Sequence, residues 1–435
     1  MRPADVLDTI RRALLVDGLP VVVDLEKSHG SVLVDARDGR EFVDLHGCFA
    51  TSALGWNHPA LSSHEFAHAV GRALANHPTN SDFYSVPMAE FVDTLRTTAQ
   101  PPELPHAFFV TGGTLGVENA LKAAMDWKVR RNLAAGRGER GTQILHFRDA
   151  FHGRSGYALS LTNTASRVKT DYFAKFDWPR IDPPVLRFPV TPEVTREVAA
   201  AEDRAVAQIE AALAARPHEI AACILEPIQA EGGDHHFRPE FLRTLRRLAD
   251  THEFLLIFDE VQTGTGTTGR WWAWQHAGVA PDLMAFGKKM TVCGMFGSTR
   301  VDEVDSVFKV SGRINSTWGE SLAHMVRATA ILKTIVAEGL LENAAARGEQ
   351  LLGGLRRSRA AQAGTLGNLR GLGCLVAADL PSAEQRNAVI KAGREAGVLL
   401  LGCGVRTLRF RPALSITAAE VDRGLDLLDR VLASV

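Results

Sequence analysis

Residues 254–290 read FLLIFDEVQTGTGTTGRWWAWQHAGVAPDLMAFGKKM and contain two short apolar runs that are followed by charged residues. The first run, 254–258, ends at Asp259, and the second, 283–286, is followed by one glycine and then Lys288. A short apolar run bounded by charges is typical of a strand buried on both faces of a parallel sheet. We therefore predict that an aspartate and a lysine follow two strand ends, at the edge where open α/β sheets bind ligands.

One cofactor chemistry uses such a pair, that of pyridoxal phosphate. The amine of a lysine forms an imine with the cofactor aldehyde, and an aspartate keeps the pyridine nitrogen protonated so that the ring accepts electrons from a carbanion. Asp259 and Lys288 suit these two roles. Asp259 and Lys288 alone do not establish this chemistry, because ion pairs at strand ends also occur without any function.

The composition is that of an ordinary globular protein, with 435 residues, 46% of them hydrophobic and 23% charged. A formal net charge of −1 gives no reason to expect a nucleic acid or an anionic membrane as partner. No apolar run approaches the roughly 20 residues of a membrane span. The five cysteines are scattered without a C-x-x-C pair, which favours reduced thiols. We expect a cytoplasmic protein that binds neither nucleic acid nor membrane.

Strands and helices alternate through the middle of the chain, as in βαβ units that build a parallel sheet. The expected strands are 108–110, 143–147, 221–225, 254–258 and 283–286, and the expected helices between them are 114–131, 198–215 and 239–252.

The two ends of the chain have a different pattern. Short strands are expected at 21–24, 31–34 and 41–45, and again after residue 370. We therefore predict an α/β fold in which residues 60–325 form a large domain, while residues 1–59 and 326–435 together form a smaller α+β domain.

Two turns offer groups that bind ligands. Gly113 and Thr114 lie between a strand and a helix, where backbone N–H groups bind anions such as a cofactor phosphate. A plain strand-to-helix turn is the alternative. Phe151 and Arg154 follow the strand at 143–147, where a ring can stack on a heterocycle and a guanidinium can bind a carboxylate. A core aromatic residue and a solvated arginine are the alternative.

Two other motifs match known patterns without the expected context. Residues 264–269 read GTGTTG, but a dinucleotide site should turn directly from a strand into a helix, and no such helix follows. His64, Glu65 and His68 match H-E-x-x-H, which on a helix would suit zinc and a hydrolase. No other feature of a metalloprotease accompanies them, so we expect no metal, and a zinc hydrolase remains a remote alternative.

Taken together, these residues resemble the class III (ω-)aminotransferases, a family of fold-type-I enzymes that depend on pyridoxal phosphate. The resemblance spans most of the chain, and its most specific motifs are 259–264 (DEVQTG), 287–288 (GK) and 316–319 (STWG). It implies a large domain with a mostly parallel sheet between helices. Segments 80–86, 176–181 and 286–289 resemble those members of the family that use L-lysine as amine donor.

The resemblance also implies roles for individual residues around the cofactor. Lys288 matches the lysine that forms the imine, Asp259 the partner of the pyridine nitrogen and Gln262 the partner of the phenolic oxygen. Phe151 matches the aromatic residue that stacks on the ring.

Other implied roles concern the phosphate and the substrates. Gly113 and Thr114 of one subunit and Thr317 of the other would bind the phosphate, which implies a homodimer with shared active sites. Arg409 matches the arginine that binds the α-carboxylate of 2-oxoglutarate. Glu231 would pair with Arg409 when the reacting end of the substrate carries no carboxylate, and Arg154 would bind the carboxylate at the far end.

The implied reaction moves the ε-amino group of L-lysine to 2-oxoglutarate. Its products are L-glutamate and 2-aminoadipate 6-semialdehyde, which cyclises to piperideine-6-carboxylate. The same fold with ornithine, 4-aminobutyrate or acetylornithine as donor is the main alternative. A class III relative that transfers no amine, and a regulator built on this fold, are more distant ones.

Overall fold

The computed structural model describes residues 1–434, and its centre is a seven-stranded sheet with the strand order β3-β11-β10-β9-β6-β4-β5. All neighbours are parallel except β11, which runs antiparallel to both β10 and β3. The five strands predicted for the middle of the chain are confirmed within two residues, whereas β5 and β11 were not predicted. The strands are β3 (His106–Phe109), β4 (Gln143–Phe147), β5 (Arg180–Ile181), β6 (Ile220–Leu225), β9 (Leu255–Asp259), β10 (Leu283–Phe286) and β11 (Gly294–Gly297).

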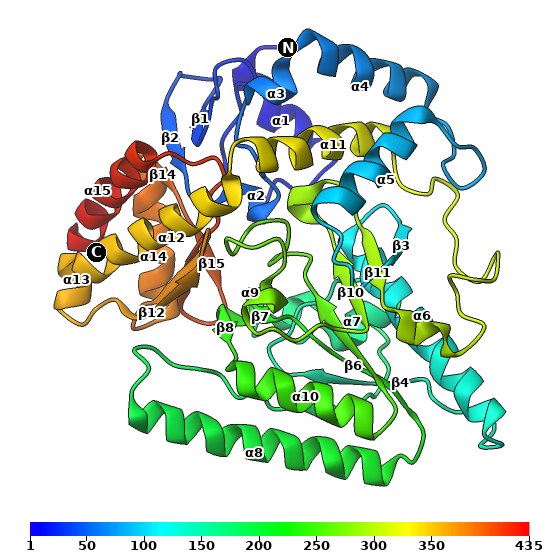
Figure 1. Cartoon of the computed structure of the whole chain (residues 1–435). Helices are drawn as coiled ribbons and strands as arrows, with labels where there is room; N and C mark the ends of the chain where they lie inside the picture. Colours follow the sequence, from blue (N-terminus) through cyan, green and yellow to red (C-terminus); the bar gives the residue numbers. More distant parts are fainter. Residues whose placement is uncertain (435) are drawn as a thin grey trace.

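Helices cover this sheet, and α8 and α10 lie along its lower side in Figure 1. Helix α8 begins earlier than predicted, because Thr191 caps it with a hydroxyl that accepts from the backbone N–H of Val194. No helix within residues 1–434 combines the length and the apolar content needed to cross a bilayer. The main helices of this part are α4 (His64–Asn76), α5 (Val86–Thr98), α6 (Gly113–Ala134), α7 (Gly156–Leu161), α8 (Pro192–Ala215), α10 (Pro239–Thr251) and α11 (Leu322–Ala337).

Strand β9 is buried on both of its faces, as its unbroken apolar run predicts. Leu255 and Ile257 pack into one hydrophobic cluster together with residues of α6. Leu256 and Phe258 point the other way, into a second cluster that includes residues of α10. All four side chains are fully buried, so the hydrophobic effect fixes the strand between two layers of helices and thereby fixes the position of Asp259 at its end.

The two chain ends meet in one small sheet of β1 (Val32–Val34), β2 (Glu41–Asp44) and β14 (Val398–Leu399), in which β2 and β14 are parallel. Figure 1 shows these N-terminal strands beside the C-terminal elements. The predicted strand at 21–24 is wrong, because only Val23 makes a single bridge there. The domain boundaries after residues 59 and 325 remain predictions.

A third sheet, with the order β12-β13-β16-β15, belongs to the C-terminal part and carries Arg409 on β16. Strand β12 and helix α14 were not predicted. The elements are β12 (Gly367–Leu372), β13 (Leu375–Asp379), β15 (Leu401–Cys403), β16 (Thr407–Phe410), α12 (Leu340–Arg357), α14 (Ala383–Ala396) and α15 (Ala418–Ser434).

Candidate active site

Asp259 and Lys288 lie at the same edge of the large sheet. Strands β9 and β10 are parallel, and Asp259 stands directly opposite Ala285 in their register. Lys288 follows the end of β10 in the same direction, so both side chains reach one cavity of about 640 Å³. The structure therefore brings together the two residues that the sequence placed at strand ends.

The carboxylate of Asp259 is buried and held by two donors. Its Oδ2 atom lies 2.8 Å from Nδ1 of His152, and its Oδ1 atom accepts from the backbone N–H of Val261 at 3.1 Å. These contacts reduce the cost of burying a charge. They also fix the direction in which the carboxylate faces.

Lys288 occupies a left-handed backbone conformation, with φ of 47°. Burial is the main cause that lowers the pKa of its amine, and the positive charge of Arg409 lowers it further, against the opposing effect of Asp259 and nearby glutamates. A lowered pKa increases the fraction of neutral amine, which is the nucleophilic form.

The start of helix α6 forms a cradle at the cavity. Gly112 has φ of 107°, and a Cβ atom on Gly113 would come within 2.7 Å of a methyl carbon of Val261, so only glycine fits there. The hydroxyl of Thr114 lies 2.7 Å from that of Ser155. The N-terminus of a 22-residue helix, together with these small side chains, offers N–H groups and a positive dipole end to an anion.

Glu226 supports the turn that carries Phe151. Its two carboxylate oxygens accept from the backbone N–H groups of Phe151 at 2.9 Å and Ala230 at 3.0 Å. Burial raises the pKa of this carboxyl to about 7, and the nearby Asp259 adds to the effect. Glu226 thus anchors the backbone next to a half-buried aromatic ring that faces the cavity.

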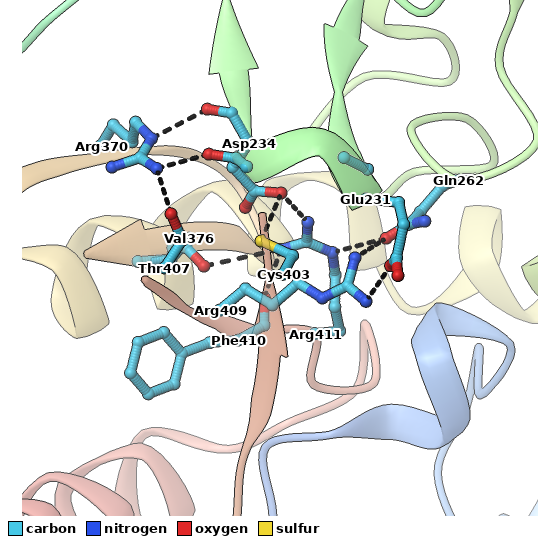
Figure 2. A network of polar contacts seen from close by, with 12 residues as sticks. Glu231, Asp234, Gln262, Arg370, Val376, Cys403, Thr407, Arg409, Phe410 and Arg411 are labelled. Atoms are coloured by element: carbon cyan, nitrogen blue, oxygen red, sulfur yellow. Dashed lines mark hydrogen bonds and ion pairs between the residues drawn. The ribbon is translucent and has the colours of Figure 1, made fainter. Parts of the chain in front are cut away.

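A network of arginines and acids lies beside the cavity (Figure 2). The Nη2 atom of Arg409 donates to Oε2 of Glu231 at 2.5 Å. Gln262 accepts on its side-chain oxygen from Nε of Arg411 at 3.1 Å and from Nη1 of Arg409 at 3.4 Å. Because two guanidinium groups face this oxygen, the amide NH₂ of Gln262 remains free to donate into the cavity.

Arg411 is itself held by Asp234, and both side chains are fully buried. Although burial raises the pKa of Glu231, the neighbouring Arg409 and Lys169 outweigh it and lower the pKa below the ordinary value. The carboxylate of Glu231, which lies between Arg409 and Lys169, is therefore ionised. The network fixes Arg409 at the border of the cavity.

Most of the site residues predicted from the sequence converge on this place. Seven of them line the 640 Å³ cavity: Gly113, Thr114, Phe151, Arg154, Asp259, Gln262 and Lys288. Glu231 and Arg409 form a pair at its border, while Thr317 is exposed and its carbonyl accepts from the hydroxyl of Ser81 at 2.7 Å. Thr317 is thus the one predicted site residue away from the cavity and its border.

Comparison with protein families gives a match over residues 15–432 to the model described as "Aminotransferase class-III". The chain belongs to the class III aminotransferase family.

This aminotransferase is 50% identical over 426 residues to the "L-lysine-epsilon aminotransferase" of Mycobacterium tuberculosis, a match that covers 97% of this chain and 94% of that protein. It is 47% identical to the protein of the same name from Amycolatopsis lactamdurans, with 99% and 96% covered. The solved structure "Lysine aminotransferase from M. tuberculosis in the internal aldimine form" superposes with a TM-score of 0.97 at 49% identity, over 100% of both chains.

The cavity of the aminotransferase fits pyridoxal phosphate, on which its family depends. The glycine cradle before α6 suits the phosphate, a buried amine of lowered pKa suits the aldehyde, and the carboxylate of Asp259 suits a protonated ring nitrogen. In addition, Nε2 of His152 is buried and has no hydrogen-bond partner among the described residues. The site therefore contains a polar atom that a bound cofactor could contact.

The two motifs that lacked the expected context do not form the sites that their patterns suggest. Residues 264–269 form turns rather than a strand–helix junction, and Gly266 and Gly269 pack against Leu341 and Ala345 of α12. His64 and His68 are exposed on α4, and no group of three or more metal-binding side chains occurs within residues 1–434. The zinc hydrolase alternative is wrong, because the chain belongs to the class III aminotransferases, which depend on pyridoxal phosphate.

The sequence indicates no specific contact for four residues of the site: His152, Glu226, Asp234 and Arg411. His152 and Glu226 stand next to motifs that were recognised, but nothing local reveals which atoms they contact. Arg411 lies two residues after Arg409, but its partner Asp234 is 177 residues away and gives no signal in sequence.

Proposed function

We propose that this aminotransferase transfers the ε-amino group of L-lysine to 2-oxoglutarate. The products are L-glutamate and 2-aminoadipate 6-semialdehyde, which cyclises to piperideine-6-carboxylate. The contact between Glu231 and Arg409 at the border of the cavity carries this proposal. Its relatives support it, since proteins named L-lysine-ε aminotransferases are 45–50% identical, whereas a rat 4-aminobutyrate aminotransferase is 31% identical.

The pair matters because one substrate presents a carboxylate beside its reacting carbon and the other presents no charged group there. 2-Oxoglutarate and glutamate carry a carboxylate next to the reacting carbon, which an arginine can bind with two hydrogen bonds. The ε-carbon of lysine has no such neighbour, so an unpaired Arg409, only 1% exposed, would be a costly buried charge. Glu231 neutralises this charge when lysine is bound. The hydrogen bond between Glu231 and Arg409 must break before Arg409 can bind the carboxylate of 2-oxoglutarate.

The far end of each substrate also carries a carboxylate. Arg154 lies exposed at the cavity and is our candidate to bind it, whether it is the α-carboxylate of lysine or the distal carboxylate of 2-oxoglutarate. The α-carboxylate of lysine lies two bonds farther from its reacting carbon than the distal carboxylate of 2-oxoglutarate does, so the long, exposed side chain of Arg154 would have to adjust its reach to serve both substrates.

When bound, pyridoxal phosphate supplies an aldehyde that accepts the amine and a ring that accepts electrons. We assign its phosphate to the backbone at Gly113 and Thr114, and one face of its ring to Phe151. The carboxylate of Asp259 would accept a hydrogen bond from the ring nitrogen, and the free NH₂ of Gln262 would donate to the phenolic oxygen.

Lys288 is the group that we propose moves protons. Its neutral amine would take a proton from the ε-carbon of lysine, and in the second half of the reaction it would return one to the α-carbon of the new glutamate. Burial favours the neutral form that this role requires.

We further propose a homodimer in which Thr317 reaches the phosphate in the partner's site. Its exposed position, away from the cavity of its own subunit, supports that assignment. The cytoplasmic location expected from five unpaired cysteines also remains a prediction.

The experiment is an assay of holoenzyme with 2-oxoglutarate and one amine donor at a time. L-lysine should give glutamate together with the cyclised product, both identified by mass spectrometry, at a kcat/KM well above that for ornithine, 4-aminobutyrate or acetylornithine. A higher kcat/KM with another of these donors would overturn the lysine assignment. Labelling the ε-nitrogen distinguishes transfer from the α-position.

A further inference from the structure

Lys169 is a second cation on the carboxylate of Glu231. It ends a short helical turn, Arg167–Lys169, in the segment between α7 and β5. Its Nζ atom lies 2.5 Å from Oε1 of Glu231, while Oε2 of the same carboxylate lies 2.5 Å from Nη2 of Arg409. The side chains of Lys169 and Glu231 are 18% and 21% exposed. Glu231 is therefore held between two positive groups from distant parts of the chain.

This arrangement bears on what happens when the pair between Glu231 and Arg409 opens. A carboxylate that leaves its arginine and stays largely buried has lost its counterion, which is costly unless another cation remains. Lys169 already touches the oxygen that does not face Arg409. Lys169 can therefore keep its contact with Oε1 of Glu231 while the hydrogen bond between Oε2 and the guanidinium of Arg409 breaks.

The space around Glu231 allows such a movement. A second cavity of about 280 Å³ is lined by both Lys169 and Glu231, together with Thr164, Arg386 and Cys403. Arg409 does not line this cavity. The Nζ atom of Lys169 also lies 5.6 Å from the centre of the Phe151 ring, which lines the main cavity. This cation–π contact helps to hold the Lys169 side chain in place.

We propose that Lys169 is a positioning residue that holds Glu231 when Arg409 binds the carboxylate of the keto acid. The inference rests on the proposed function, in which Arg409 alternates between Glu231 and a substrate carboxylate. It predicts that substitution of Lys169 affects the two half-reactions unequally. Loss of Lys169 impairs the half-reaction with 2-oxoglutarate, because Glu231 in the open state loses the cation that contacts its other carboxylate oxygen. The half-reaction with lysine is largely spared, because Arg409 stays paired with Glu231 throughout.

The test compares the two half-reactions of holoenzyme by single-turnover absorbance in Lys169→Met and in the parent. A charged hydrogen bond of this kind corresponds to about tenfold in rate or affinity. We expect Lys169→Met to lower kcat/KM for 2-oxoglutarate about tenfold, mainly through KM, and to change the lysine half-reaction by less than about twofold. Lys169→Arg, which retains the charge, should restore most of the loss.

Lys175→Met is the matched control. Lys175 lies in the same segment, but among residues 1–434 its amine donates only to the backbone carbonyls of Thr170 and Phe173. This variant should leave both half-reactions unchanged. Equal losses in both half-reactions of Lys169→Met, or no loss in either, would overturn the role of Lys169.

The failure of the proposed function looks different. If the parent reacts with 2-oxoglutarate but prefers another ω-amine to lysine, the donor assignment fails. The comparison of Lys169→Met with the parent can then be repeated with that amine, and the same asymmetry still decides the role of Lys169.

Discussion

Nδ1 of His152 lies 2.8 Å from Oδ2 of Asp259, and both side chains are buried at the carboxyl edge of the large sheet. An ionised carboxylate can only accept, so this contact places the proton of the imidazole on Nδ1. The histidine thereby orients the carboxylate that we assign to the ring nitrogen of the cofactor.

Asp259→Asn should lower kcat by orders of magnitude, because an amide cannot keep the ring nitrogen protonated. His152→Ala should cost less, about tenfold, because it removes one charged hydrogen bond and leaves the carboxylate in place. Steady-state kinetics of both variants, at saturating cofactor, test this order. Normal turnover in Asp259→Asn would remove the assignment of this residue.

Lys288→Ala should fold and bind the cofactor but should not transaminate. Reduction of the parent holoenzyme with borohydride, followed by peptide mapping, should place the cofactor on Lys288. Its neighbour Lys289 is buried against the N-terminal segment, with its amine 3.3 Å from the carbonyl of Ala50. Modification of Lys289 instead of Lys288 would show that the motif was aligned one residue off.

Lys289→Met should keep activity and should stabilise the protein near neutral pH. Burial lowers the pKa of Lys289 from 10.5 to about 8 in the folded protein, so its charge opposes folding below that pH. Between pH 8 and 10.5 the unfolded chain binds more protons than the folded one, so the parent gains stability as pH rises. Denaturant unfolding should show a gain of on the order of 3 kcal/mol at pH 7 that shrinks toward pH 10.

Glu231→Ala should impair the lysine half-reaction far more than the glutamate half-reaction. Without the glutamate, Arg409 has no carboxylate partner when lysine is bound, whereas glutamate brings its own. A selective loss of about tenfold to hundredfold is expected in single-turnover measurements with each amine donor. Equal losses with the two donors would exclude the exchange of partners at Arg409, although the chain would still be an aminotransferase.

Asp234→Ala should destabilise the fold. Asp234 is the carboxylate partner of Arg411, and both side chains are fully buried, so removal of the acid leaves an uncompensated charge in the interior. Breaking such a pair costs about 3–5 kcal/mol. Arg423→Ala is a suitable control, because Arg423 forms an exposed pair with Glu41 and should change the free energy of unfolding by less than about 1 kcal/mol.

Much of the large sheet could be predicted from local sequence. The strands that carry Asp259 and precede Lys288 are continuous apolar runs, and such runs report burial on both faces without knowledge of their partners. Strand β11 escaped prediction because its four residues, Gly294 to Gly297, begin and end with glycine, which has low strand propensity. It forms because β10 and β3 offer it hydrogen-bonding partners on both sides.

The sequence by itself determined the chemical groups of the site, since Asp259, Lys288 and the turn at Gly113 each follow from a strand end and its neighbours. Only the tertiary structure decided which of these groups meet. The contacts of His152 with Asp259 and of Glu231 with Lys169, and the pairing of β2 with β14, join segments far apart in the chain. Such contacts leave no periodic signal, because they depend on how the packed layers bring distant strand ends and loops together.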